Sequence, residues 1–153
     1  MSAKYAGTGQ DAAITTTPGT TAFEVHAITA SLRRGWMYYL AFGFSGTPAD
    51  IAIRMQVMET TAAGTATAVV PTKMQSADVA SMMTAGENHS AEPTYTSATE
   101  KLDISLNQRT TYQWQAIPGG EFVWPATNVA GLGVKCFHAS STVAAEATVH
   151  WEE

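Results

Sequence analysis

GENHSAEPTYTSATEKLDISLNQRTTYQWQAIPGGEFVWP, residues 86–125, is the stretch that decides the fold. Within it, apolar residues alternate with polar ones over residues 102–106 and again over residues 112–114. A Pro-Gly-Gly break at residues 118–120 then precedes a short apolar run at residues 122–124. Alternation with a period of two places every second side chain on one face of an extended chain. The stretch therefore predicts half-buried antiparallel strands.

The same pattern continues outward from this stretch. Alternating apolar residues over 23–27, 51–57, 132–138 and 143–151 predict four more strands. A continuous aromatic and apolar run over 36–44 predicts a central strand, because it is short for a helix and rich in aromatic side chains. About eight strands joined by Gly, Pro, Ser and Thr turns indicate an all-β, antiparallel β-sandwich with a jelly-roll-like topology.

The middle of the chain has no continuous period. Thr60–Val70 could hold one short strand. Ser76–Thr84 predicts a short helix with Ser76 as its N-cap. The alternative for this second segment is an irregular excursion that exposes Met82 and Met83.

The length of 153 residues suits one domain, preceded here by an arm. Residues 1–21 are rich in Gly, Thr and Ala and show no period, which predicts a flexible N-terminal arm that orders only against a neighbour. A loose terminus is the alternative. Residues 22–153 are then the single β-sandwich domain, and deletion of residues 2–20 is expected to leave its fold intact.

Composition and charge narrow the possible partners and compartments. Hydrophobic residues make up 45% of the chain and charged residues only 14%, which is typical of a globular protein with a weakly charged surface. The net charge of −5 argues against nucleic acid as a partner, because phosphate binding needs a concentrated basic patch and Arg33-Arg34 is an isolated pair. No stretch is long and apolar enough for a membrane span or a signal peptide. The single Cys136 excludes an intrachain disulfide, fits a reducing cytoplasm and is expected to be a buried thiol.

Known signatures of catalysis and cofactor binding do not occur in the sequence. It contains no Gly-rich phosphate loop, no GxSxG nucleophile motif and no CxxC or HExxH metal motif. We therefore predict that the protein is not an enzyme. We also predict no cofactor and no catalytic, cofactor-binding or metal-binding residues.

Three small groups of polar residues are weaker candidates for metal binding or acid–base catalysis. They are the pairs Glu24 with His26 and His150 with Glu152, and the cluster Glu87, His89 and Glu92. Residues two apart on a strand share a face, so each pair could approach one metal ion. In the cluster, a carboxylate and an imidazole could act as acid and base. Hydrogen bonds that stabilise turns and strands are the simpler interpretation of all three groups.

The four tryptophans suggest a second class of function, carbohydrate binding. Aromatic side chains exposed in a row on a sandwich face would suit a carbohydrate-binding module, with a surface glycan as the partner. The observation that decides is whether Trp36, Trp124 and Trp151 are exposed in such a row. Core packing is the alternative, because three of the four tryptophans, counting Trp114, lie in alternating or continuous apolar runs.

Three segments of the chain resemble a known family. They are TAAGTATAVVPTKM at residues 61–74, the stretch TAGENHS to FVWPAT at residues 84–127, and AAEATVHWEE at residues 144–153. Their combination resembles head structural proteins of tailed bacteriophages and prophages, and most of all capsid decoration, or cement, proteins. The resemblance covers about the last two thirds of the chain and consists of scaffold positions and turns.

This resemblance implies a structural virion protein without enzymatic activity. Such a protein is a β-sandwich subunit, commonly a homotrimer, which decorates the outer capsid and clamps neighbouring subunits of the major capsid protein. It implies a place on the virion surface after assembly in the bacterial host cytoplasm. A tail-associated or baseplate-associated β-sandwich is the alternative. The N-terminal arm could add main-chain hydrogen bonds to the shell by strand addition.

Overall fold

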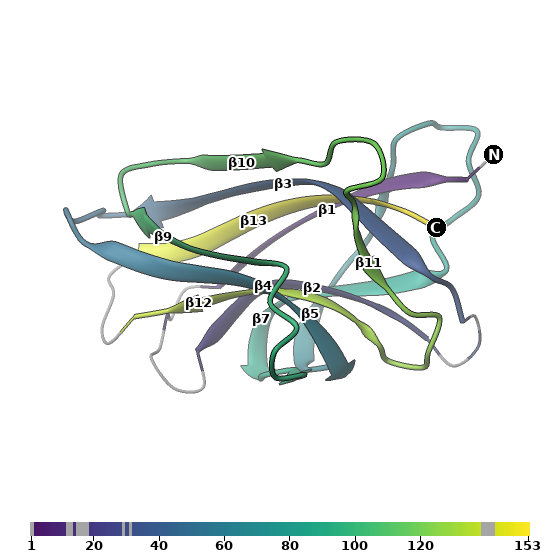
Figure 1. Ribbon diagram of the computed structural model, residues 1–153, viewed down its shortest axis with the longest axis horizontal. Helices are drawn as coiled ribbons and strands as arrows, with labels where there is room; N and C mark the ends of the chain where they lie inside the picture. Colours follow the sequence, from purple (N-terminus) through teal and green to yellow (C-terminus); the bar gives the residue numbers. More distant parts are fainter. Residues whose placement is uncertain (1, 12–13, 15–18, 29, 31, 139–142) are drawn as a thin grey trace.

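Two antiparallel sheets form the computed structural model, which describes residues 2–11, 14, 19–28, 30, 32–138 and 143–153. Thirteen strands and no helix occur in these residues, and Figure 1 shows the strands in two layers. Sheet A contains β1 (Lys4–Asp11), β3 (Gly35–Gly46), β6 (Thr72–Lys73), β10 (Tyr112–Gln115), β11 (Phe122–Trp124) and β13 (Val143–Glu152). Sheet B contains β2 (Thr20–Ala27), β4 (Ala52–Ala62), β5 (Thr65–Val69), β7 (Met83–Ala91), β8 (Thr94–Tyr95), β9 (Leu102–Asn107) and β12 (Gly131–Phe137). In the described part of the chain, no helix is long and apolar enough to cross a membrane.

The strand order confirms the predicted all-β, antiparallel sandwich and is compatible with a jelly roll. In sheet A the order is β10-β3-β13-β1-β6, with β11 also beside β3. In sheet B it is β5-β7-β2-β12-β4-β8, with β9 also beside β4. The eight strands predicted from alternation or from continuous apolar runs are present as β2, β3, β4, β9, β10, β11, β12 and β13, and β5 lies within the short strand suggested for residues 60–70.

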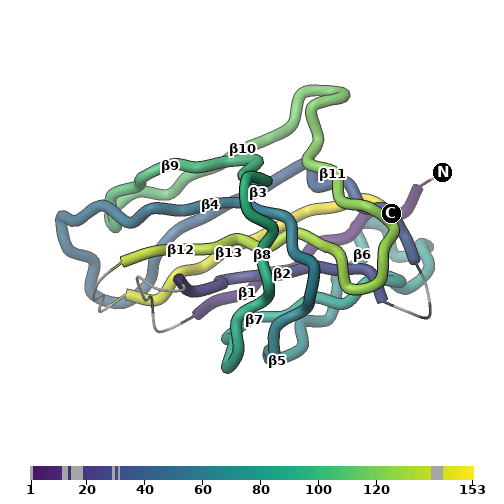
Figure 2. Tube along the Cα trace, turned by 60° about the horizontal axis from the view of Figure 1, so that its bottom comes forward, coloured from purple at the N-terminus to yellow at the C-terminus, as the bar shows by residue number. Residues whose placement is uncertain are grey.

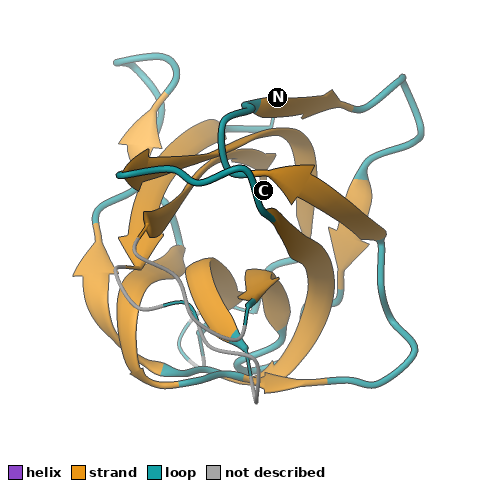
Figure 3. Ribbon diagram, turned by 90° about the vertical axis from the view of Figure 1, so that its left-hand side faces the viewer, coloured by secondary structure: helices purple, strands orange, loops and turns teal. Residues whose placement is uncertain are grey.

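The core lies between the two sheets, which curve around it when the molecule is viewed from one end (Figure 3). Trp124 and Trp151 are fully buried. The Trp151 ring lies 6.0 Å from the ring of Tyr5 and 6.3 Å from that of Phe23, so it joins β13 to strands of both sheets. Gly35 makes room for Trp124, because a Cβ atom there would lie 1.9 Å from the indole. These contacts confirm core packing for two of the four tryptophans.

Strand β1 contradicts the expectation of a flexible arm over residues 1–21. Residues 4–11 pair with β13 along their whole length and pair with β6 near their beginning. Residues 20–21 already belong to β2. The predicted arm also included residues 12–13 and 15–18, which lie outside the described residues. The sandwich therefore begins well before residue 22.

Glycine residues at inward positions explain why the hydrophobic pattern of the sequence does not reveal β1. The inward positions of residues 4–11 carry only one large apolar side chain, that of Tyr5, which is fully buried. The next two inward positions are Gly7 and Gly9. A Cβ atom on Gly7 would lie 2.6 Å from the Phe23 ring, and one on Gly9 would lie 3.0 Å from the same ring. Close approach of the two sheets thus requires glycine where an alternating pattern would show apolar side chains.

The short helix predicted over Ser76–Thr84 is wrong. Residues 76–82 form turns, bends and irregular chain, and β7 begins at Met83. Met83 is buried whereas Met82 is exposed, so only one of the two methionines matches the alternative of an exposed excursion. A helix this short is marginal unless it buries an apolar face, and this segment offers mostly small and polar residues.

Two neighbouring strands of sheet B are joined by a charged network at the surface. The Arg54 guanidinium donates to both carboxylate oxygens of Asp103, with Nε 2.8 Å from Oδ1, and the Gln56 amide donates to Oδ2 at 2.9 Å. The hydrogen bonds from Arg54 hold the pKa of Asp103 at about 2, well below its usual value.

We expect an NMR titration of the carboxyl carbons to find the pKa of Asp103 near 2. The variant Arg54→Ala should raise this pKa toward the ordinary value of 3.8, because the Asp103 carboxylate loses the guanidinium that stabilises its charge. Lys101→Ala is the control, since Lys101 pairs with Glu59 instead. A wild-type Asp103 that titrates near 3.8 would contradict the network.

Candidate functional site

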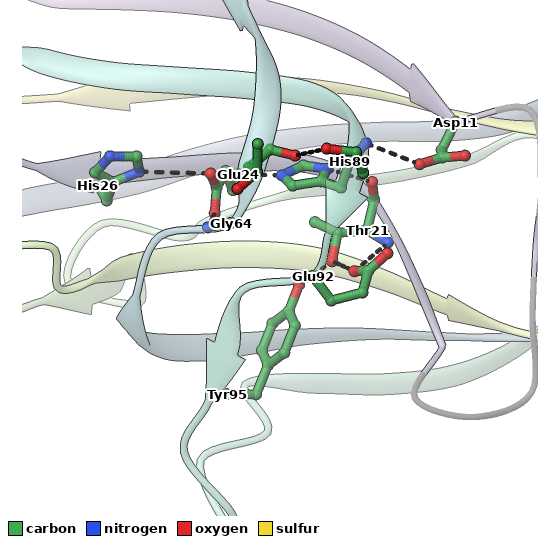
Figure 4. Close-up of polar contacts among 10 residues, drawn as sticks. Asp11, Thr21, Glu24, His26, Gly64, His89, Glu92 and Tyr95 are labelled. Carbon is green, nitrogen blue, oxygen red and sulfur yellow. Dashed lines mark hydrogen bonds and ion pairs between the residues drawn. The ribbon is translucent and has the colours of Figure 1, made fainter.

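Polar side chains are buried against the outer face of sheet B, and we call this group the buried polar cluster. Figure 4 shows its members, which are Asp11, Thr21, Glu24, His26, Gly64, His89, Glu92 and Tyr95. Glu24 and His26 project from β2 on the face opposite to the core residues Phe23 and Val25. Both are nevertheless buried, so other parts of the chain must cover this face.

The cover consists of the β4–β5 turn and the segment that includes β8. Figure 2 shows that segment crossing the strands of sheet B. The Gly64 amide in the turn donates to Glu24 Oε2 at 3.2 Å. A Cβ atom on Gly64 would lie 2.6 Å from the His89 ring, and one on Gly133 would lie 2.3 Å from the Tyr95 hydroxyl oxygen. Two glycines thus allow the cover to lie directly on the sheet.

His89 is held with one ring nitrogen on the backbone and the other toward a carboxylate. Its Nδ1–H donates to the Thr21 carbonyl at 2.9 Å, since a carbonyl oxygen can only accept. Its Nε2 lies 3.4 Å from Glu24 Oε1, in the range of an ion pair but without the geometry of a hydrogen bond. A neutral ring would direct a lone pair at the carboxylate, so the arrangement favours the imidazolium.

The electrostatics of this pair agree with its geometry. Burial alone would lower the pKa of His89, but the Glu24 carboxylate, with help from Glu92 and the Thr21 carbonyl, raises it above the ordinary value. Burial alone would raise the pKa of Glu24, but His89, the Gly64 amide and His26 together hold it below the ordinary value. The pair is therefore a buried ion pair with both partners charged.

His26 approaches the same carboxylate from a different direction (Figure 4). Its Nδ1 lies 3.8 Å from Glu24 Oε1 and has no hydrogen-bond partner. Burial lowers the pKa of His26, and the charge on His89 lowers it further, although Glu24 opposes both effects. The Glu24 carboxylate is therefore flanked by one charged and one neutral imidazole.

A second branch of the cluster runs from Tyr95 to Glu92 through Thr21. The Tyr95 hydroxyl lies 2.6 Å from Thr21 Oγ1, and the Thr21 hydroxyl and amide both donate to Glu92 Oε2. Because the Thr21 hydroxyl donates to Glu92, the Tyr95 hydroxyl donates to Thr21. Burial raises the pKa of Glu92 and raises that of Tyr95 well above its usual range.

Two carboxylates connect this cluster to the edge of sheet A. Asp11 on β1 accepts a hydrogen bond from the backbone amide of His89 at 3.1 Å, and Glu87 on β7 accepts one from the backbone amide of Gln10 at 2.9 Å. At this side of the sandwich the two sheets are therefore joined by side-chain carboxylates on backbone amides. The cluster lies where the two layers meet.

Burial limits what the buried polar cluster can do chemically. The His89 side chain is fully buried and Glu24 is 2% exposed. Such an arrangement suits an ion pair that holds strands together better than groups that meet a substrate. Among the described residues, no group of three or more His, Cys, Asp or Glu side chains is arranged to hold a metal ion.

In the structure, the pair Glu24 with His26 lies next to the cluster that the sequence analysis identified around His89. The pair Glu24 with His26 does share a face, and His89 and Glu92 from the downstream cluster join it. Glu87 lies beside them on β7 and bonds to β1. Thr21, Asp11 and Tyr95 were missed, because Thr21 meets Tyr95 only where the β8 segment crosses sheet B, and Asp11 meets His89 only where β1 lies beside β7.

The second predicted pair, His150 with Glu152, lies apart on the outer face of sheet A. The His150 ring lies 4.7 Å from the ring of Tyr39 in a tilted arrangement, and Glu152 Oε2 lies 3.7 Å from Lys4 Nζ. Ser2 also donates to Glu152. The two side chains thus have separate partners.

Trp36, Trp124 and Trp151 do not form the exposed row that a carbohydrate-binding module would need, because Trp124 and Trp151 are in the core. Trp114 stacks on Phe122 with ring centroids 4.1 Å apart, and Trp36 is half-buried on the outer face of sheet A. Cys136 is a free, buried thiol, as predicted, and burial raises its pKa.

Both chain termini lie at one end of the sandwich in Figure 1, and four exposed apolar side chains lie near residues 3, 4 and 153 at this end. We call this the apolar end, and it consists of Leu32, Met74, Val79 and Met82, each between 40% and 69% exposed. Arg33 lines two adjoining hollows, one with Leu32 and the other with Val79 and Met82. The Met74 amide donates to the Lys4 carbonyl, which places this residue beside them.

Comparison with known proteins adds no relative. No protein family, curated protein or solved structure matches the chain. The resemblance to phage head proteins therefore stays a prediction that rests on the three segments at residues 61–74, 84–127 and 144–153.

Proposed function

We propose that this protein is a non-enzymatic structural subunit of a tailed-phage virion. As a homotrimer it decorates the outer capsid and clamps neighbouring subunits of the major capsid protein. The observation that carries the proposal is the apolar end. Large apolar side chains that are exposed together typically mark a surface that contacts another protein. The resemblance of the three sequence segments is the reason for proposing the capsid shell as that protein.

The buried polar cluster supports the same role. Its groups with acid–base character are occupied by contacts between strands, which suits a rigid body that acts through its surface. A rigid trimer engages several shell sites at once, and such multivalency raises avidity by about two to four orders of magnitude. Modest individual contacts, of the size that the apolar end offers, are then sufficient.

Cryo-electron microscopy of purified virions tests the location. We expect density for this sandwich on the outer shell, in threefold groups that touch adjacent capsid subunits. Density in the tail or baseplate would favour the alternative of a tail-associated sandwich and would overturn the capsid role. Particles without the protein would overturn both.

A variant of the apolar end tests the contact itself. Val79→Asp places a charge on a side chain that is 69% exposed, while the Val79 carbonyl can still accept its hydrogen bond from Tyr5. We expect attachment to empty capsids to fall at least about tenfold, because a carboxylate would have to be desolvated in the contact. The measurement is co-sedimentation of purified subunit with capsids lacking it.

Ile117→Asp is the matched control, since Ile117 is 77% exposed but lies between β10 and β11, outside the apolar end. Both variants should keep the thermal stability of the wild type, because surface substitutions usually change the unfolding free energy by less than about 0.5 kcal/mol. Equal attachment of the Val79 variant and the wild type would show that the apolar end is not the contact.

A further inference from the structure

A hollow of about 330 Å³ lies on the outer face of sheet A. Its lining residues are Lys4, Trp36, Tyr38, Glu121 and Glu152. We propose that this hollow binds a neutral saccharide. The hollow adjoins the apolar end, because Trp36 also lines the hollow that contains Leu32 and Arg33.

Strand pairing brings these residues together from four neighbouring strands or their ends. Lys4 on β1 is opposite Glu152 on β13, and Glu152 is in turn opposite Trp36 on β3. On the other side of β3, β11 pairs in such a register that Glu121, the residue before β11, comes next to Tyr38. The neighbouring Met37 is fully buried in the core. Alternation along β3 therefore directs the two aromatic side chains outward.

Aromatic and charged groups in the hollow match the two kinds of surface on a pyranose. The Trp36 ring offers an apolar face on which the C–H face of a sugar ring can stack, and the Tyr38 ring, over which Lys4 Nζ lies, forms part of the wall. Lys4 Nζ lies 3.7 Å from Glu152 Oε2, so an ammonium donor and a carboxylate acceptor stand side by side. Adjacent sugar hydroxyls each donate and accept, which suits such a pair. The volume lies at the lower end of the range for small-molecule sites.

Charge selects the class of saccharide. The lining contains two carboxylates and one ammonium, so it repels phosphates and acidic sugars. A cationic ligand would have to compete with Lys4, whose Nζ already lies 5.3 Å from the centre of the Tyr38 ring and pairs with Glu152. A neutral saccharide can bind without displacing this pair, because the pair itself supplies hydrogen bonds.

The test is a titration of the full chain, followed by proton–nitrogen NMR. The probes are the methyl glycosides of glucose, galactose and mannose, N-acetylglucosamine, and glucuronate as the acidic comparison. We expect at least one neutral probe to give saturable shifts of the Trp36 indole and of backbone amides around Lys4 and Glu121. Dissociation constants in the millimolar range are typical of a shallow site with few contacts. Glucuronate should bind more weakly than the neutral sugars.

Two variants with a matched control localise the effect. Trp36→Ala and Glu152→Gln should each weaken binding at least about tenfold, the first by removing the stacking face and the second by removing a charged acceptor. Glu146→Gln should bind like the wild type, because Glu146 is on the same strand and the same face as Glu152 but does not line the hollow. Thermal melting checks that all three variants fold.

Several results would overturn the proposal. One is the absence of saturable shifts with every neutral probe up to about 50 mM, a concentration well above a millimolar dissociation constant. Another is binding that the Trp36 and Glu152 variants leave unchanged. A third is saturation of the hollow by a lysine or arginine methyl ester without any response to the sugars, which would identify a cation site instead.

Discussion

Deletion of residues 2–11 is expected to unfold the protein. These residues include β1, which lies between β13 and β6 in sheet A and pairs with β13 along its whole length. Its Tyr5 ring packs against Trp151, and both are fully buried. Loss of one large buried aromatic side chain alone costs about 3–5 kcal/mol. That is comparable with the whole stability of many domains, about 5–15 kcal/mol.

Circular dichroism with temperature, together with size-exclusion chromatography, measures the outcome. We expect the truncated chain to show no cooperative transition or to aggregate through the exposed edge of β13. A truncated chain that melts cooperatively at the wild-type temperature would restore the idea of a dispensable arm.

Point variants keep the prediction testable if the truncated chain cannot be purified. Tyr5→Ala should lower the unfolding free energy by about 3–5 kcal/mol, since it leaves a cavity beside Trp151. Tyr5→Phe retains the ring and removes only the hydroxyl that donates to the Val79 carbonyl at 3.1 Å, so it should cost about 1 kcal/mol. Equal effects of the two variants would show that the ring packing is not what holds β1.

The contrast between β1 and β13 shows what the sequence can and cannot predict about this fold. Strand β13 buries every second residue, with large or branched side chains at several of these positions, so its period is visible in the sequence. Strand β1 also buries alternate residues, but Gly7 and Gly9 occupy two of them and carry no signal. Strand β7 is hidden for a related reason, because its residues are mostly small or polar. Packing between layers, rather than local pattern, decides such strands.

The buried polar cluster could also be predicted only in part from the sequence. Local spacing correctly paired Glu24 with His26 and grouped His89 with Glu92. It could not bring the two groups together, because they are more than sixty residues apart and meet only through the pairing of β2 with β7. Nor could it show that the cluster is covered, since the cover depends on glycine at residues 64 and 133.

Glu24→Leu is expected to lower the unfolding free energy by about 3–5 kcal/mol, the usual cost of breaking a buried ion pair from one side. The variant leaves the imidazolium of His89 and the Gly64 amide without their acceptor. Glu24→Gln should cost less, because its amide oxygen can still accept from Gly64. Glu100→Gln, a change at an exposed carboxylate, should remain within about 0.5 kcal/mol of the wild type.

The dependence of stability on pH follows from the directions of the pKa shifts. The pKa of His89 is raised in the folded state, so its contribution is complete below the ordinary value of 6.5 and is lost as the pH rises through the raised pKa. Glu92, whose pKa is also raised, loses its contribution as the pH rises from 4.5. The pKa of Glu24 is lowered, so its contribution is present above 4.5 and is lost as the pH falls through the lowered pKa. His26, also lowered, weakens the fold as the pH falls below 6.5.

These opposing shifts predict a maximum of stability in mildly acidic to neutral solution, with a first decline above pH 6.5 as His89 loses its proton and a further one above about pH 9, where the buried Cys136 and Tyr95 oppose ionisation. In Glu24→Gln the carboxylate that contributes most to raising the pKa of His89 is absent, so this pKa should fall and the alkaline decline above pH 6.5 should flatten. Melting temperatures across the pH range, with the NMR titration of the His89 ring, measure both effects. Glu24→Gln is the suitable variant, because it removes the charge beside His89 and keeps an acceptor for the Gly64 amide. If stability falls above pH 6.5 by the same amount in Glu24→Gln and in the wild type, the buried pair is not the cause of the decline.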